Sequence, residues 1–100
     1  MKYVVVQVVR KVRNPDGTTG EETLELPVIF PKELVHADMA DMVNLAVRRG
    51  MDHWQSTKTV SAGFVNFDAD IICHGRSESL GMDSRRDVDA KLIEKLGPVY

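Results

Sequence analysis

The stretch YVVVQVVRKVRNPDGTTGEETLELPVIF (Tyr3–Phe30) decides the fold of this chain, because it reads as two strands joined by a turn. Tyr3–Arg13 is dense in β-branched valine, which favours a strand with apolar side chains on both faces. Asn14–Gly20 combines proline, aspartate and glycine, whose backbone preferences are typical of turns. Thr23–Phe30 alternates apolar and polar side chains, which is the period of a half-buried strand. We therefore predict a β-hairpin with residues 14–20 as its loop.

Two features of the hairpin predict its surroundings. Pro27 cannot donate a hydrogen bond to a neighbouring strand, so the second strand is expected at a sheet edge or with a bend. Basic side chains of the first strand lie opposite acidic side chains of the second, so cross-strand pairing explains them without a nucleic acid. These side chains are Arg10, Lys11 and Arg13 on one strand and Glu21, Glu22 and Glu25 on the other.

The rest of the chain predicts a helix, two further strands and a second helix. A helix from Glu33 or His36 to Arg49 is indicated by apolar residues at three- and four-residue steps, with Gly50 as its C′ residue. The expected strands are Thr59–Phe67 and, after a turn at Asp68–Asp70, a strand from Ile71 to His74, with Ser77 as its furthest end.

The last predicted helix begins at a capping box, Ser84–Asp87, and continues to Leu96. Val88, Leu92 and Leu96 are expected along its apolar stripe. The order β-β-α-β-β-α predicts an α+β fold: a four-stranded, mainly antiparallel sheet with two helices on one face. The other sheet face is then open to solvent or to a second copy.

Composition limits the class of protein. The chain has 100 residues, which fits a single α+β domain over residues 1–100. Its formal net charge of −2 argues against a dedicated nucleic-acid binder. The single cysteine, Cys73, excludes an intrachain disulfide and favours a reducing compartment such as the cytoplasm. No apolar run approaches the ~20 residues of a membrane span, so we expect a soluble, unprocessed chain with no membrane partner.

The segment Cys73–Asp87 concentrates the groups best suited to recognition. Its arginines and serines, at a predicted strand-loop-helix junction, suit a phosphate, a nucleotide or an acidic partner surface. The favoured interpretation is nevertheless structural: Leu80 and Met82 cover the end of the core while the serines bond backbone groups. If Ser84 and Asp87 cap the helix, the candidate binding residues are Arg76, Ser77, Glu78, Ser79 and Arg85. The segment carries no nucleotide fingerprint.

Metal, cofactor and catalytic sites receive little support. Cys73 and His74 are adjacent in a strand and point to opposite faces, so they cannot easily share a metal ion or form a nucleophile pair. Cys73 is expected to pack as a small apolar residue. A small hydrolase would need Ser77 or Cys73 beside a histidine through long-range contacts. We therefore predict no metal, no cofactor and no enzymatic activity.

Trp54 is the remaining candidate for a contact residue. It lies in the polar segment Met51–Lys58, next to His53. Tryptophan is enriched at the centres of protein interfaces, but it also packs against helix ends through its large apolar ring. Both interpretations of Trp54 stay open.

Parts of the chain resemble a group of small uncharacterised proteins of bacteriophages and prophages. The resemblance is carried by VSAGFV (Val60–Val65), CHGRSESLG (Cys73–Gly81), Ser84, Arg85 and Asp87, with a weaker similarity from Phe30 to Asp38. It spans residues 30–95, and its most specific piece is the string Gly75–Gly81. The resemblance implies a phage-encoded accessory protein in the host cytoplasm, and it supplies no catalytic motif.

These observations predict a small accessory protein that binds a host or phage protein, for example as an inhibitor of a host enzyme or defence system. A homodimer through the open sheet face or an edge strand is a further expectation. The alternative is a nucleotide or nucleic-acid phosphate binder that uses the Arg76–Arg86 loop. A small hydrolase is the weakest alternative.

Overall fold

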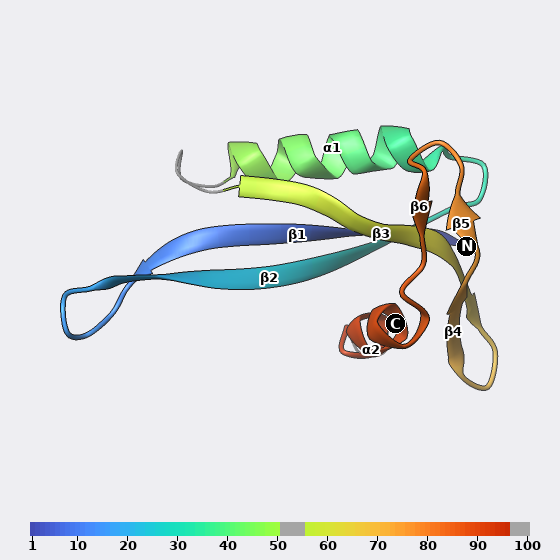
Figure 1. Cartoon of the computed structure of the whole chain (residues 1–100). Helices are drawn as coiled ribbons and strands as arrows, with labels where there is room; N and C mark the ends of the chain where they lie inside the picture. Colours follow the sequence, from blue (N-terminus) through green and yellow to red (C-terminus); the bar gives the residue numbers. More distant parts are fainter. Residues whose placement is uncertain (51–55, 97–100) are drawn as a thin grey trace.

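The computed structural model describes residues 1–50 and 56–96, which form an antiparallel sheet with a helix on each face (Figure 1). The strands are β1 (Lys2–Arg13), β2 (Thr19–Phe30), β3 (Ser56–Phe67) and β4 (Ile71–His74), in the order β2-β1-β3-β4. A second, two-stranded sheet pairs β5 (Arg76–Ser77) with β6 (Met82–Asp83). The helices are α1 (His36–Arg49) and α2 (Arg86–Glu94). The α+β class is therefore confirmed, and so are the two hairpins.

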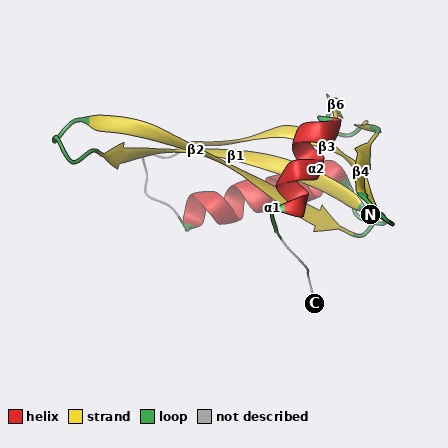
Figure 2. Ribbon diagram, turned by 90° about the horizontal axis from the view of Figure 1, so that it is seen from below, coloured by secondary structure: helices red, strands yellow, loops and turns green. Residues whose placement is uncertain are grey.

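The β1–β2 hairpin is longer than the sequence predicted. Its strands stay paired as far as Arg13 and Thr19, and it projects beyond both helices (Figures 1 and 2). The turn is tight because Asp16 accepts hydrogen bonds from the backbone N–H and hydroxyl of Thr18, while Gly17 adopts a φ of 86°. The predicted ion pairing is present where Arg10 meets Glu22 at 2.7 Å. Pro27 lies on an edge strand, as its missing N–H predicts.

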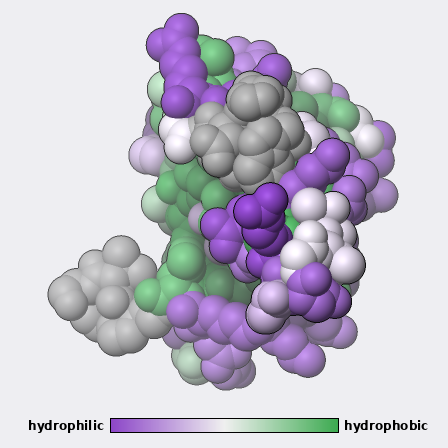
Figure 3. Space-filling view, turned by 90° about the vertical axis from the view of Figure 1, so that its left-hand side faces the viewer, coloured by the Kyte–Doolittle hydropathy of each residue, from purple (hydrophilic) through white to green (hydrophobic). Residues whose placement is uncertain are grey.

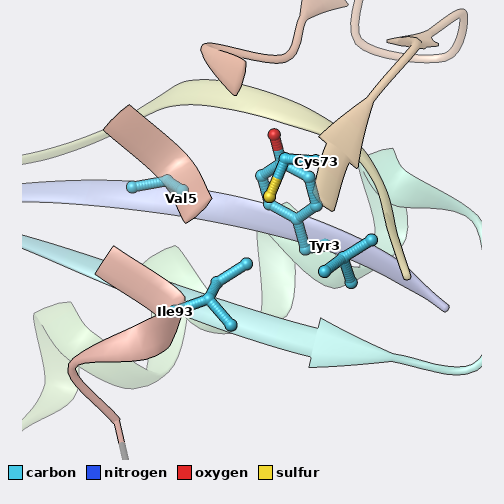
Figure 4. Packing of buried hydrophobic residues seen from close by; sticks show 5 residues of the cluster. Tyr3, Val5, Cys73 and Ile93 are labelled. Carbon is cyan, nitrogen blue, oxygen red and sulfur yellow. The ribbon is translucent and has the colours of Figure 1, made fainter. Parts of the chain in front are cut away.

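The prediction that both helices share one face is wrong. On the odd-numbered face of β1, Tyr3 and Val5 are buried in a cluster with Cys73 of β4 and Ile93 of α2 (Figure 4). On the even-numbered face, Val4 is buried with Phe30 and Ala62 and with Ala40 of α1, in a separate cluster. The physical reason is the valine-rich composition of β1, which gives apolar side chains to both faces and so requires a cover on each.

A register shift in the β1–β3 pair sets which residues of β3 lie on each face of the sheet. Val5 pairs with Ser61, but Val6 pairs with Thr59, so β3 contains one extra residue at this point. Ser61 consequently shares the α2 face with Val5. Thr59 shares the α1 face with Val6, where its hydroxyl accepts a 3.1 Å hydrogen bond from Asn44 of α1.

Helix ends also differ from the predictions. The Ser84–Asp87 capping box is not formed. Arg85 is the N-cap residue of α2, and its side chain makes no capping hydrogen bond to the first turn of the helix. Ser84 instead donates a 2.9 Å hydrogen bond to the Gly75 carbonyl, which ties the two ends of the loop together. Gly50 follows α1 with a φ of −88°, so it does not use the left-handed conformation expected of a C′ glycine.

Candidate interaction surface

The predicted recognition loop is built into the fold. Ser77 is fully buried, and its hydroxyl accepts a 3.2 Å hydrogen bond from the Leu80 N–H. Ser79 accepts a 3.1 Å hydrogen bond from the Ala37 N–H in the first turn of α1. Leu80 and Met82 pack against the cluster beneath α1. The geometry therefore matches the structural interpretation of this loop, since its serines and apolar side chains are used internally.

Ser79 compensates for the absence of a side-chain cap at the start of α1. Val35 occupies the N-cap position and has no side-chain group that could accept a hydrogen bond. The first N–H groups of any helix need acceptors from outside the helix. Ser79 supplies one from a loop that follows 42 residues later in the chain. The Gly75–Ser84 loop is thus a cover for the start of α1.

The charged residues of the loop are partly neutralised. Arg76 pairs with Asp83 at 3.0 Å across β5 and β6, and both side chains are largely exposed. Glu78 is exposed. Arg85 pairs with Glu25 of β2 at 2.8 Å and with Asp89 of α2 at 3.0 Å. Because Arg76 and Arg85 already face carboxylates, these two side chains offer a phosphate little uncompensated positive charge.

Asp89 is the important residue that the sequence interpretation missed. Its side chain is fully buried. One carboxylate oxygen accepts hydrogen bonds from the Tyr3 hydroxyl (2.6 Å) and the Arg85 N–H (2.8 Å). The other accepts from the Ser61 hydroxyl (2.9 Å) and from Nε of Arg85 (3.1 Å). A buried carboxylate is tolerated when its oxygens are satisfied and its charge is paired, and both conditions hold here.

The Asp89 network joins α2 to three strands. Tyr3 belongs to β1, Ser61 to β3, and Arg85 leads on to Glu25 of β2. The contacts of Nη1 of Arg85 with Glu25 and of Nη2 with Asp89 are ion pairs at short distance whose angles do not fit hydrogen bonds. Since Asp89 is inaccessible to solutes, the network acts by positioning α2 on the sheet.

Burial shapes the chemistry of two groups next to this network. The pKa of the Tyr3 hydroxyl is raised above its ordinary value of 10.0, first by burial and then by its hydrogen bond to Asp89. Burial also raises the pKa of the Cys73 thiol. Cys73 therefore packs as a small apolar residue, as predicted, and its thiol resists conversion to the nucleophilic thiolate.

The histidines of the described residues have structural partners. His36 is buried between Phe30 and Phe64, and its Nε2 donates to the Gly63 carbonyl at 2.8 Å. His74 stacks on Phe64. Neither ring is hydrogen-bonded to Ser77 or Cys73 in the part of the chain that the structure describes. Within the same ranges, no three metal-ligating side chains lie close enough to hold an ion.

Gly63 of β3 lies where β4 and the Gly75–Ser84 loop come close to β3. A Cβ atom at this position would lie 2.7 Å from the backbone oxygen of His74 and 3.0 Å from Cβ of Ser84. Any larger residue would therefore push β4 or the loop away from β3. The sequence alone gave no sign that this glycine is needed for close packing.

The β2 flank combines a strand edge that has no described neighbour with exposed apolar side chains. We use this name for the unpaired outer edge of β2 together with Leu24 and Leu26. In the order β2-β1-β3-β4, β2 has no described strand on its outer side. Leu24 and Leu26 are 42% and 39% exposed. They pair with Val8 and Val6 of β1, so they lie on the α1 face, beside the helix. Figure 3 shows hydrophobic surface along one side of the molecule between polar surfaces.

Trp54 lies outside the described residues.

Of the five loop residues predicted to bind, Ser77 and Ser79 contact each other at 3.4 Å, while Arg76 and Arg85 pair with different carboxylates. Among these five residues, the two serines are the pair that the structure shows in contact with each other. Among residues 1–50 and 56–96, no helix has the length and apolar character needed to cross a membrane.

Comparison with known proteins found no similar protein. No family model, curated protein or solved structure matches this chain. The resemblance to phage and prophage proteins therefore stays a prediction from the sequence.

Proposed function

We propose that this protein is a phage- or prophage-encoded accessory protein that acts in the host cytoplasm by binding a protein partner, without catalysis. Inhibition of a host enzyme or defence system is the concrete form of this role. The observation that carries the proposal is the β2 flank, where a strand edge with no neighbour among the described residues coincides with two exposed leucines. The proposed contact therefore moves from the Arg76–Arg86 loop to the edge of the sheet.

The chemistry of the β2 flank fits an extended segment of the partner. An edge strand offers backbone N–H and C=O groups to an added strand, and alternate side chains supply specificity. Leu24 and Leu26 project on the same face, two residues apart, as such a contact needs. Pro27 has no N–H, so the usable edge extends from Thr19 to Leu26.

Two features of β2 restrict which partner can add to it. Pro27 interrupts continuous strand pairing, and Glu21 and Glu22 are charged residues on the edge strand. Proline and charged side chains on an edge strand oppose indiscriminate sheet extension. The edge is consequently suited to one complementary segment with apolar side chains for the leucines, rather than to open-ended self-assembly.

The test places a photo-crosslinking amino acid at Leu24 or Leu26 in the expressed protein. The control carries it at Ile72 of β4, which is 53% exposed. We expect one host or phage protein to be cross-linked from positions 24 and 26 and not from 72. The purified partner should then bind the Leu24→Lys/Leu26→Lys variant at least about tenfold more weakly than wild type, since burying a leucine contributes up to about 1.5–3 kcal/mol.

Matched variants decide the outcome. Ile72→Lys should bind the purified partner as wild type does. Binding through apolar contacts and backbone hydrogen bonds should also change little with ionic strength, whereas phosphate binding would weaken steeply. Equal cross-linking from position 72, or unchanged affinity of the double-lysine variant, would show that the β2 flank is not the contact.

A further inference from the structure

The outer face of α1 carries a self-complementary pattern. Figure 1 shows α1 on the outside of the molecule, with the sheet on its other side. Six exposed residues of α1 lie outside the buried stripe and carry its charges and large apolar side chains, with Asp41 and Arg48 on the same flank: Asp38 and Asp41, then Met42 and Leu45, then Arg48 and Arg49. Along the helix the outer face is therefore acidic, then apolar, then basic.

The burial pattern fixes which residues belong to this face. His36, Ala40 and Asn44 are buried against the sheet at four-residue steps. At 3.6 residues per turn, Leu45 lies nearly opposite the middle of that buried stripe. Met42 is 63% exposed and Leu45 is 48% exposed. Two large apolar side chains thus lie next to each other at the centre of the exposed face.

The charges on α1 have no ion-pair partner within the described residues. The four ion pairs formed there involve Arg10, Arg76 and Arg85, and none uses a charged residue of α1. The helix dipole favours acidic residues in the first turns of α1 and basic residues in its last turn. It does not explain why exposed Met42 and Leu45 separate them.

We propose that the outer face of α1 binds a second copy of this chain, with the two α1 helices antiparallel about a twofold axis. With the axis between Met42 and Leu45, Met42 of each copy lies opposite Leu45 of the other. Asp38 then lies opposite Arg49. Asp41 is offset from Arg48 by two residues, about 3 Å along the helix, which an arginine side chain spans. Each symmetry-related contact occurs twice, as in an isologous dimer.

The expected dimer is weak. A helix of 14 residues is about 21 Å long, and a contact of that length lies at the small end of specific interfaces. We therefore expect dissociation in the micromolar range at low salt. Because the charge pairs are exposed, affinity should fall as ionic strength rises. The proposal is independent of the β2 flank, whose edge stays free in this arrangement.

Charge exchange on α1 tests the arrangement by sedimentation equilibrium. One variant, Asp38→Arg/Asp41→Arg, makes the outer face wholly basic, and the other, Arg48→Asp/Arg49→Asp, makes it wholly acidic. Each variant alone should self-associate at least about tenfold more weakly than wild type. The reason is that the Asp38–Arg49 and Asp41–Arg48 pairs, each present twice in the dimer, become contacts between like charges. Mixed in equal amounts, the two variants should form a heterodimer at least as tight as the wild-type dimer. The recovery also shows that both variants fold.

A matched apolar pair provides the second arm. Leu45→Glu should weaken self-association, and Val88→Glu on α2, at 49% exposure, should not. A wild-type protein that stays monomeric at hundreds of micromolar overturns the proposal. So does a dimer that ignores the charge exchanges, or one weakened equally by Leu45→Glu and Val88→Glu. Leu24→Lys/Leu26→Lys should leave self-association unchanged, which separates a failure here from a failure of the proposed function.

Discussion

The two faces of the sheet are stabilised in different ways. On the α1 face, Val4, Phe30, Ala40 and Ala62 form an apolar cluster whose packing has no directional requirement. Two neutral hydrogen bonds also join α1 to β3 there, from His36 to the Gly63 carbonyl and from Asn44 to the Thr59 hydroxyl. On the α2 face, an apolar cluster surrounds a buried carboxylate, Asp89, whose hydrogen bonds have fixed partners and directions.

The difference follows from how much surface each helix can bury. α1 has 14 residues and lies along the sheet, whereas α2 has nine and crosses it (Figures 1 and 2). Isolated helices shorter than about 12–15 residues are marginal in water, so most of their stability comes from tertiary contacts. The short helix α2 is held by a buried, ion-paired carboxylate, whereas the longer helix α1 combines apolar burial with neutral hydrogen bonds from His36 and Asn44. Breaking each face separately tests this comparison.

Asp89→Ala should have the largest effect of the predicted substitutions. It leaves the Tyr3 and Ser61 hydroxyls and the Arg85 guanidinium without their shared acceptor. Breaking a buried charge pair costs about 3–5 kcal/mol, so the free energy of unfolding in urea should fall by that amount. Asp87→Ala is the control, since Asp87 is exposed on the same helix. A loss below about 0.5 kcal/mol for Asp89→Ala, within the ordinary range for exposed sites, would contradict the positioning role.

Val4→Ala tests the opposite face. Val4 is fully buried in the cluster beneath α1, so removing two methyl groups should reduce the free energy of unfolding by about 2 kcal/mol, from lost burial and the cavity left behind. The loss should add to that of Asp89→Ala, because the two residues share no partner. Urea denaturation of the double variant measures this. Strong non-additivity would show that the two faces are one cooperative network, and the comparison would fail.

The sequence predicted most elements and failed on how they are placed. Alternation in β2 and the valines of β1 were sufficient for the hairpin, because such patterns are local. The same valines also indicated apolar side chains on both faces of β1, which is the signal for a helix on each side. Placing both helices on one face overlooked it.

Asp89 was harder to predict for a physical reason. Its partners Tyr3 and Ser61 lie 86 and 28 residues away, so no local pattern distinguishes it from an exposed acidic residue. The expected stripe of α2 placed Val88 and Leu96 inward, yet they are 49% and 53% exposed. The buried positions are Asp89 and Ile93, four residues apart. A hydrophobicity pattern cannot find a stripe whose central member is a buried carboxylate.

Tyr3→Phe sharpens the comparison through pH. Removing the hydroxyl leaves Asp89 with its other donors, so the loss at neutral pH should be about 1–2 kcal/mol in urea denaturation. The raised pKa of Tyr3 means that the unfolded state ionises first. Its contribution to stability is therefore complete below the ordinary pKa of 10.0 and is lost as pH rises above it. Wild type should lose more stability than Tyr3→Phe between about pH 9 and pH 11.

Absorbance at 295 nm checks the same point directly. The difference between the alkaline titrations of wild type and Tyr3→Phe isolates the Tyr3 phenol. It should stay flat through pH 10 while the protein is folded, and it should appear together with unfolding. Ionisation of Tyr3 at its ordinary pKa in the folded protein would mean that the hydroxyl is not held against Asp89.

Ser79→Ala should have the smallest effect and tests one of the neutral hydrogen bonds on the α1 face. The substitution removes the acceptor for the Ala37 N–H. Loss of a helix cap costs about 1 kcal/mol, less than either buried substitution. Hydrogen exchange should show faster exchange at Ala37, with little change in α2. Ser56→Ala, at an exposed serine of β3, is the control. If Ser79→Ala destabilised the protein as much as Asp89→Ala, a neutral hydrogen bond on the α1 face would contribute as much as the buried carboxylate on the α2 face, and the distinction between the faces would be lost.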